Sequence, residues 1–154
     1  MADMTSVSAK RVISAPIDQV WEVFTDIPDA ANRIEGIDSV EMLSEGPFSV
    51  GTRWRETRTM MGRAATEEMW VTKADGPHQY QVEAESNGAH YVTRYDFREV
   101  DGGTEVTYVF AADTLTTSAK VMSALTGWMI KGSVKKMMQA DIDNLADVLE
   151  IQNP

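Results

Sequence analysis

The sequence predicts an α+β domain in which an antiparallel sheet of about seven strands is followed by a long C-terminal helix. Three observations carry this prediction. Apolar and polar residues alternate with a period of two from residue 37 to residue 112, which is typical of half-buried strands. Turn residues such as Asn87-Gly88 separate these runs. Residues 117–151 then repeat apolar side chains at helical spacing.

The N-terminal part predicts one strand and two short helices. Residues 7–14 form the expected strand, and Ala15-Pro16 opens a helix, because proline is tolerated where the first N–H groups have no intrahelical partner. Apolar side chains recur at helical spacing at Val20, Trp21, Phe24 and Ile27. Residues 29–33 are expected to form the second short helix. With 154 residues, we expect one domain over residues 1–154.

Six further strands are expected at 37–44, 51–61, 64–74, 78–86, 89–100 and 104–113. A two-residue turn at Asn87-Gly88 would pair Tyr80 with Tyr95, and a turn near Gly102 would pair Tyr95 with Tyr108. In this register one face of three strands is apolar and aromatic and the other is polar, as in a sheet with one buried face. A slip of one residue would invert the faces, which favours this register.

The final helix, at 117–151, carries two apolar stripes that are offset from one another around its axis. Val134, Met138, Ile142 and Leu149 belong to the second stripe. Two glycines, Gly127 and Gly132, lie between the stripes, and glycine is a common cause of kinks. We therefore expect a kink or break in this helix.

Composition narrows the range of partners and of chemistry. The net charge of −10 and the pI of about 4.6 disfavour binding to nucleic acid or to anionic lipid headgroups. The chain has no cysteine, which excludes disulfides and thiolate sites. No stretch is long and apolar enough for stable membrane insertion, and no leader pattern is present, so a cytoplasmic protein is expected.

The hairpin at residues 54–71 mixes apolar and charged side chains on one face. Alternation places Trp54, Glu56, Arg58 and Met60 on that face of the first strand, and Glu67 and Met69 on the same face of the second. We expect Arg58 opposite Glu67 and Glu56 opposite Met69, so that Arg58 can bridge both carboxylates. Glu56, Arg58 and Glu67 are the candidate catalytic residues. A structural salt-bridge network, ligand orientation and acid/base chemistry all remain open for them.

The expected ligand-binding surface continues onto the neighbouring strands and the final helix. It adds the side chains of Tyr80, Tyr91, Tyr95, Phe97, Tyr108, Phe110, Met122, Leu125 and Met129. Buried hydroxyls need partners, so four tyrosines favour a cavity that holds water or an oxygenated ligand. The two histidines, His78 and His90, have no partners at metal-ligand spacing, and neither a metal nor a cofactor is expected.

Four segments resemble the START-like (SRPBCC) superfamily, most closely its polyketide cyclase/dehydrase-like branch. They are IxAPxDxVWxxxTDI at 13–27, GTRWRETR at 51–58, ATEEMWVT at 65–72 and DIDNLADVLE at 141–150. The resemblance implies the helix-grip fold, a curved antiparallel sheet wrapped around a long C-terminal helix with a deep cavity between them. Relatives bind lipids, sterols, hormones or polyketides there, and some catalyse cyclisation or dehydration.

Three functions are consistent with these features. The first is binding or carriage of a hydrophobic, partly oxygenated small molecule. The second is a cyclase or dehydratase-like enzyme, with Glu56 or Glu67 as the base and Arg58 or a tyrosine stabilising the oxyanion. The third is a protein-interaction module, for which Trp70, expected on the outer face, is a candidate contact. Because no histidine lies in the expected cavity, the first function is favoured. Ligand identity and oligomeric state stay open.

Overall fold

A computed structural model describes the chain except for residues 1–4, 61, 87–88 and 115–116. Seven strands form one antiparallel sheet in the order β1-β7-β6-β5-β4-β3-β2. Their bounds are β1 Thr5–Ile13, β2 Ile37–Met42, β3 Arg53–Met60, β4 Arg63–Asp75, β5 Gln79–Ser86, β6 Ala89–Val100 and β7 Gly103–Thr114. Helix α1 (Ile17–Phe24), a 3-10 turn η1 (Ile27–Asp29) and helix α2 (Ala30–Arg33) follow β1, and α3 (Thr117–Gln152) ends the chain.

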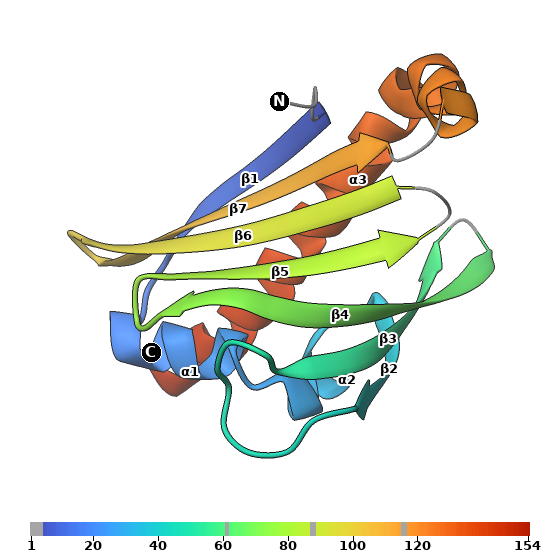
Figure 1. Cartoon of the computed structure of the whole chain (residues 1–154). Helices are drawn as coiled ribbons and strands as arrows, with labels where there is room; N and C mark the ends of the chain where they lie inside the picture. Colours follow the sequence, from blue (N-terminus) through green and yellow to red (C-terminus); the bar gives the residue numbers. More distant parts are fainter. Residues whose placement is uncertain (1–4, 61, 87–88, 115–116) are drawn as a thin grey trace.

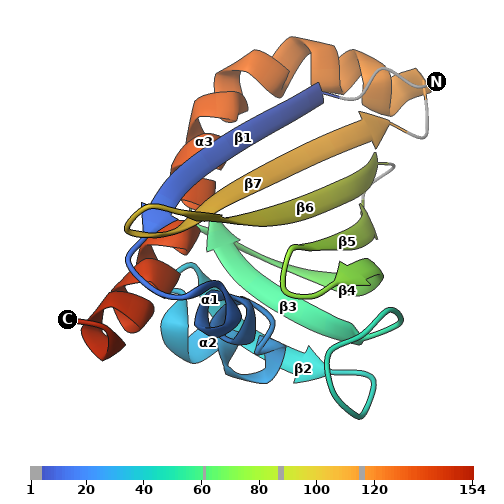
Figure 2. The same ribbon diagram turned by 90° about the vertical axis from the view of Figure 1, so that its left-hand side faces the viewer.

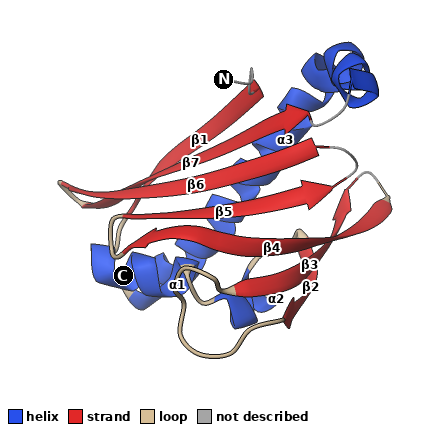
Figure 3. Ribbon diagram, in the orientation of Figure 1, coloured by secondary structure: helices blue, strands red, loops and turns tan. Residues whose placement is uncertain are grey.

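All the helices lie on one side of the sheet, so one sheet face is covered and the other is open (Figure 3). The sheet curves, and α3 crosses its covered face (Figures 1 and 2). The core between them includes Val20 of α1, Val106 of β7, and Met138, Ile142 and Leu149 of α3, all fully buried. This is the expected helix-grip architecture, with two short helices between the first and second strands.

Helix α3 is continuous from Thr117 to Gln152, but its first turns run in a different direction from the remainder (Figure 2). The expected change of direction is therefore a bend in one helix rather than a break. In the part of the chain that the structure describes, no helix is long and apolar enough to cross a membrane. The side chains of Met122, Leu125 and Met129 lie outside the described residues.

The expected register of the three central strands is confirmed. Tyr80 pairs with Tyr95, and Tyr95 pairs with Tyr108, so three tyrosine rings follow one another across the sheet. Their ring centroids are 4.8 Å and 4.3 Å apart along this row. Alternation thus places an aromatic row on the covered face, as the sequence indicated.

The register expected for the β3–β4 hairpin is wrong by two residues. Met60 pairs with Arg63, so only two residues form the turn, and the second of them, Gly62, has a φ of 76° that suits glycine. Arg58 therefore lies opposite Ala65, and Glu56 lies opposite Glu67. Because the register is shifted by an even number of residues, each side chain stays on the face to which it was assigned. Every cross-strand partner nevertheless changes.

Candidate functional site

A cavity of about 370 Å³ lies between the covered face of the sheet, the α1–α2 segment and α3. Its walls are mainly aliphatic and aromatic. The lining side chains are Phe24, Ile27, Ala30, Ile34, Ile37, Trp54, Glu56, Arg58, Arg63, Ala65, Glu67, Met69, Tyr80, Val82, Tyr91, Thr93, Tyr95, Tyr108, Phe110, Val134, Met137 and Leu145. A concave, mostly apolar space with a few polar groups is the usual form of a small-molecule site.

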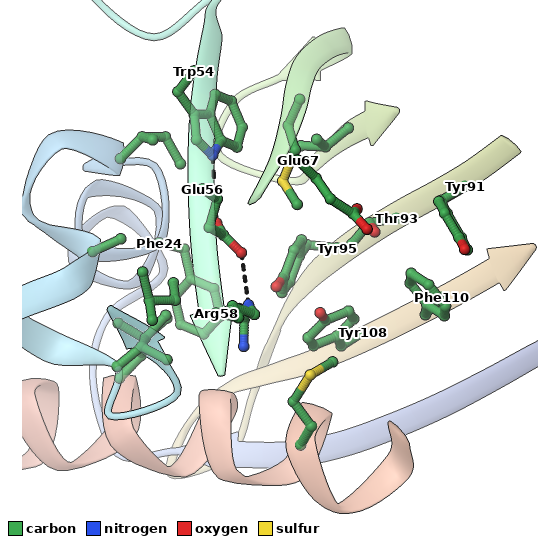
Figure 4. A pocket seen from close by; sticks show the side chains of 18 of the residues that line it. Phe24, Trp54, Glu56, Arg58, Glu67, Tyr91, Thr93, Tyr95, Tyr108 and Phe110 are labelled. Carbon is green, nitrogen blue, oxygen red and sulfur yellow. Dashed lines mark hydrogen bonds and ion pairs between the residues drawn. The ribbon is translucent and has the colours of Figure 1, made fainter. Parts of the chain in front are cut away.

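A buried ion-pair network forms one wall of the cavity (Figure 4). Arg58 donates from Nε to Glu56 over 2.6 Å and from its two terminal nitrogens to Asp141 over 3.2 Å and 2.8 Å. The indole N–H of Trp54 also donates to Glu56, over 3.4 Å. The side chains of Arg58, Glu56 and Asp141 are 17%, 9% and 4% exposed. The network thus ties β3 to the second half of α3.

The charges in this network do not balance, because two carboxylates face one guanidinium. Burial lowers the pKa of Arg58, but the negative charges of Glu56 and Asp141 outweigh it and the pKa is raised overall. Burial also raises the pKa of Asp141, against the stabilising effect of Arg58 and with a further contribution from Glu56. Arg58 is therefore permanently charged, and the excess negative charge sits beside the cavity.

Glu67 brings a second carboxylate to the lining of the cavity, from β4. It lies directly opposite Glu56 in the ladder and projects toward the space between β3 and the tyrosines (Figure 4). Partial burial, followed by the negative charge of Glu56, raises the pKa of Glu67. Among the described residues no basic side chain lies within ion-pair distance of Glu67. This acid is thus the cavity group that is best placed to accept or release a proton or to bind a donor.

The tyrosines supply hydroxyl groups along the opposite wall. Tyr80 is buried and donates to the backbone carbonyl of Phe24 over 3.3 Å. Burial, above all, raises the pKa of Tyr95 and of Tyr108, and the Asp141 carboxylate adds to the increase for both. Both hydroxyls remain protonated at neutral pH and interact with one another, which leaves one donor hydrogen for an oxygen atom of a ligand.

The structure brings together ten of the side chains expected to line a site, drawn from β3, β4, β5, β6 and β7. They are Trp54, Glu56, Arg58, Glu67, Met69, Tyr80, Tyr91, Tyr95, Tyr108 and Phe110. Phe97 is placed differently: it is buried in an aromatic cluster 5.2 Å from Phe24 and 5.9 Å from Trp21, between ring centroids, and does not line the cavity. The side chain of Met60, like those named above in α3, is outside the described residues.

The sequence prediction missed Asp141, which holds Arg58 in place of the expected Glu67. A signal was present, because Asp141 lies three residues after Met138 and four before Leu145, on the buried side of α3. An acid at such a position needs a buried partner. The wall formed by α1, α2 and the start of β2 was also missed, with lining from Phe24, Ile27, Ala30, Ile34 and Ile37.

The outer face carries charged groups that do not reach the cavity. Trp70 lies there, as expected, with the guanidinium of Arg53 4.9 Å from its ring centroid. His90 is held by Glu83 over 2.7 Å and by Glu85 over 3.3 Å. Among the described residues no group of three or more histidines and acids could hold a metal ion.

Comparison with known proteins links this geometry to a family. The family model described as polyketide cyclase / dehydrase and lipid transport matches residues 4–150. The solved Zhui aromatase/cyclase from Streptomyces sp. R1128 has a TM-score of 0.82 at 18% identity, with 99% of this chain and 97% of that chain covered. No curated protein matches the sequence.

Two plant proteins share the fold at similarly low sequence identity. The major latex-like protein 151 of Panax ginseng has a TM-score of 0.71 at 15% identity, with 95% of this chain and 97% of that chain covered. A point mutant of Thalictrum flavum norcoclaurine synthase, solved with a transition-state analogue, has a TM-score of 0.73 at 13% identity, with 100% and 99% covered. At such identities the likeness establishes the fold alone.

Proposed function

This chain belongs to the polyketide cyclase/dehydrase and lipid transport family, and we propose that it binds and carries a hydrophobic, partly oxygenated small molecule. The ligand would be lipid-like or polyketide-like and would lie between the sheet and α3. The observation that carries this proposal is the cavity of about 370 Å³, with its aromatic walls and one charged end.

The size and the lining of the cavity both support a ligand. Its volume falls within the range of roughly 300–1,000 Å³ that small-molecule sites occupy. Water that fills this space would lie mainly against aromatic and aliphatic walls. Displacing such water by an apolar ligand is favourable.

The polar groups of the cavity suit a ligand with oxygen atoms. The hydroxyl pair of Tyr95 and Tyr108 can donate to a carbonyl or ether oxygen, while Glu67 can accept from a hydroxyl. These groups approach the cavity from β4, β6 and β7, so they can fix the orientation of a flat or elongated molecule.

Blocking the cavity tests the proposal. Thr93 lines it from the middle of β6, so Thr93→Trp should fill the space and weaken binding of the neutral fluorophore N-phenyl-1-naphthylamine by about tenfold or more. Thr66→Trp is the matched control, because Thr66 lies on the outer face of β4. Equal binding by both variants, each with a cooperative thermal melt, would exclude the cavity as the site.

A dehydratase-like enzyme is the second candidate, and the position of Glu67 favours it. A half-buried carboxylate with a raised pKa can take a proton from an acidic C–H next to a ketone. An aryl β-hydroxyketone is a suitable reporter, since its loss of water forms a conjugated enone with new ultraviolet absorption. We expect the wild-type protein not to accelerate this loss of water. If it does, and if Glu67→Gln abolishes the acceleration, the enzyme is favoured over the carrier.

A further inference from the structure

The polar end of the cavity carries more negative than positive charge. Glu56 and Glu67 line this end, and Asp141, which pairs with Arg58 without lining the cavity, adds a third carboxylate. Arg58 is the buried cation among them. The other lining arginine, Arg63, is exposed at the turn end of β4, where water and salt screen its charge. A ligand that enters this end therefore meets an excess of negative charge.

Arg58 does not present an open anion site, although it lines the cavity. Three of its five N–H groups are used, one by Glu56 and two by Asp141 in a bidentate arrangement. Its positive charge is already more than neutralised by these two carboxylates. A ligand carboxylate would have to displace one of them or bear the repulsion of both.

Glu67 has no described cation within ion-pair distance, although the Ser86 hydroxyl and, from further away, Arg58 stabilise its charge. It lines the cavity and faces Glu56 across the ladder. This arrangement favours a ligand group that donates a hydrogen bond. A ligand hydroxyl or ammonium group would donate to Glu67 and reduce its repulsion with Glu56, while an anion would increase that repulsion. The same geometry that suits a donor thus excludes an acid.

Resting on the proposed binding function, we propose that this cavity selects ligands whose polar end is a neutral or cationic hydrogen-bond donor, a hydroxyl or an amine, and rejects carboxylates. Free fatty acids and other carboxylated lipids are then poor ligands, while phenols, alcohols and amines of similar size bind. The selectivity follows from Glu67 and from the neutralisation of the Arg58 charge by Glu56 and Asp141.

Three probes of similar size and different charge test this selectivity by isothermal titration calorimetry at neutral pH. They are 2-naphthol, 2-naphthylmethylamine and 2-naphthoate, which bring a neutral donor, a cation and an anion. We expect the naphthol and the amine to bind at least about tenfold tighter than the naphthoate. Glu67→Gln should narrow the gap between amine and naphthoate several-fold. Its matched control is Glu68→Gln, which removes the same charge from the outer face of the same strand and should leave the gap unchanged.

Each result has one meaning. Naphthoate binding that equals or exceeds the binding of the other two overturns the charge selectivity and leaves the proposed binding function standing. Equal narrowing by both variants shows an effect of net charge alone and overturns the role of Glu67. No binding by any of the three overturns the binding function itself and the selectivity with it. If Glu67→Gln fails to fold, the order of the three wild-type affinities decides.

Discussion

Strand β3 carries arginines on both faces, and the ion pairs of the two faces differ in their exposure to water. Arg58 points into the covered side, where it meets Glu56 and Asp141 and all three side chains are largely buried. Arg55 points outward and pairs with Glu41 over 2.8 Å, with 50% and 65% of the two side chains exposed. Similar groups at similar distances thus sit in two dielectric environments within one strand.

The difference shows that distance alone does not measure an ion pair. On the outer face water solvates both partners before and after folding, so the pair adds little. On the covered face Glu56, Arg58 and Asp141 have lost most of their water. The two carboxylates are compensated only by the positive charge of Arg58. A network of this kind is costly to break even where it adds little net stability over an apolar core.

The largest expected effect is the removal of Arg58. Arg58→Ala should lower the free energy of unfolding by about 3–5 kcal/mol, because it leaves Glu56 and Asp141 buried without a cation. Arg55→Ala, on the same strand, should cost about 0–1 kcal/mol. Urea unfolding followed by circular dichroism measures both. Similar losses for the two variants would mean that burial does not separate the two faces.

A smaller effect is expected when the whole network is made apolar. The triple variant Glu56→Leu, Arg58→Met, Asp141→Leu should regain the about 3–5 kcal/mol that Arg58→Ala loses and so come close to the wild type, because no charge is left without a partner. Binding of 2-naphthol then separates the roles of the network. Recovered stability with intact binding indicates a structural network, and recovered stability with weakened binding indicates that it orients the ligand. A triple variant no more stable than Arg58→Ala would contradict the electrostatic explanation.

The two faces of β3 were predictable from the sequence, but the partners across the hairpin were not. Alternation fixes which side chains share a face, and this held for Trp54, Glu56 and Arg58. The register depends on turn length, and the turn at Gly62 lacks the Asn-Gly or Asp-Gly pair that identifies a two-residue hairpin. Where that pair occurs, at Asn87-Gly88, the expected register is confirmed.

The choice of Asp141 as the partner of Arg58 depends on tertiary structure. The final helix offers several acids, including Asp141, Asp143 and Asp147, and only the packing of α3 on the sheet decides which one is buried. Asp143 instead accepts from Arg11 of β1, over 2.8 Å, on the other side of the helix. Sequence spacing identified the buried stripe of α3, but the contact between Arg58 and Asp141 joins residues 83 positions apart.

A third prediction compares the two faces through pH. Burial and the charge of Glu56 raise the pKa of Glu67, so in mildly acidic solution the folded protein holds a proton that the unfolded chain has released. This contribution to the free energy of unfolding therefore increases as the pH falls through that window. For Glu83 on the outer face burial acts to raise the pKa, but hydrogen bonds from neighbours including His90 outweigh it and the pKa is lowered. Its contribution is lost as the pH falls.

Urea midpoints of wild type, Glu67→Gln and Glu83→Gln over the range of about pH 4 to about pH 6 measure these opposite slopes. The advantage of the wild type over Glu67→Gln should grow as the pH falls. Its advantage over Glu83→Gln should shrink. Slopes of the same sign for both differences would show that the two acids share one environment, against the contrast between the faces.

The smallest expected effect concerns Trp70, the aromatic residue of the outer face. Its ring is only partly buried and is covered by the guanidinium of Arg53 from the neighbouring strand. The ring thus has a contact within its own chain, which reduces the need for a partner protein to cover it. Trp70→Ser should lower the free energy of unfolding by about 0.5–1 kcal/mol through loss of this cation–π contact. Light scattering should give the same mass for wild type and variant. A lower mass for the variant would instead assign the Trp70 surface to a contact between chains. Burial at the outer face would then depend on assembly, and the contrast with Arg58 would hold only for the isolated chain.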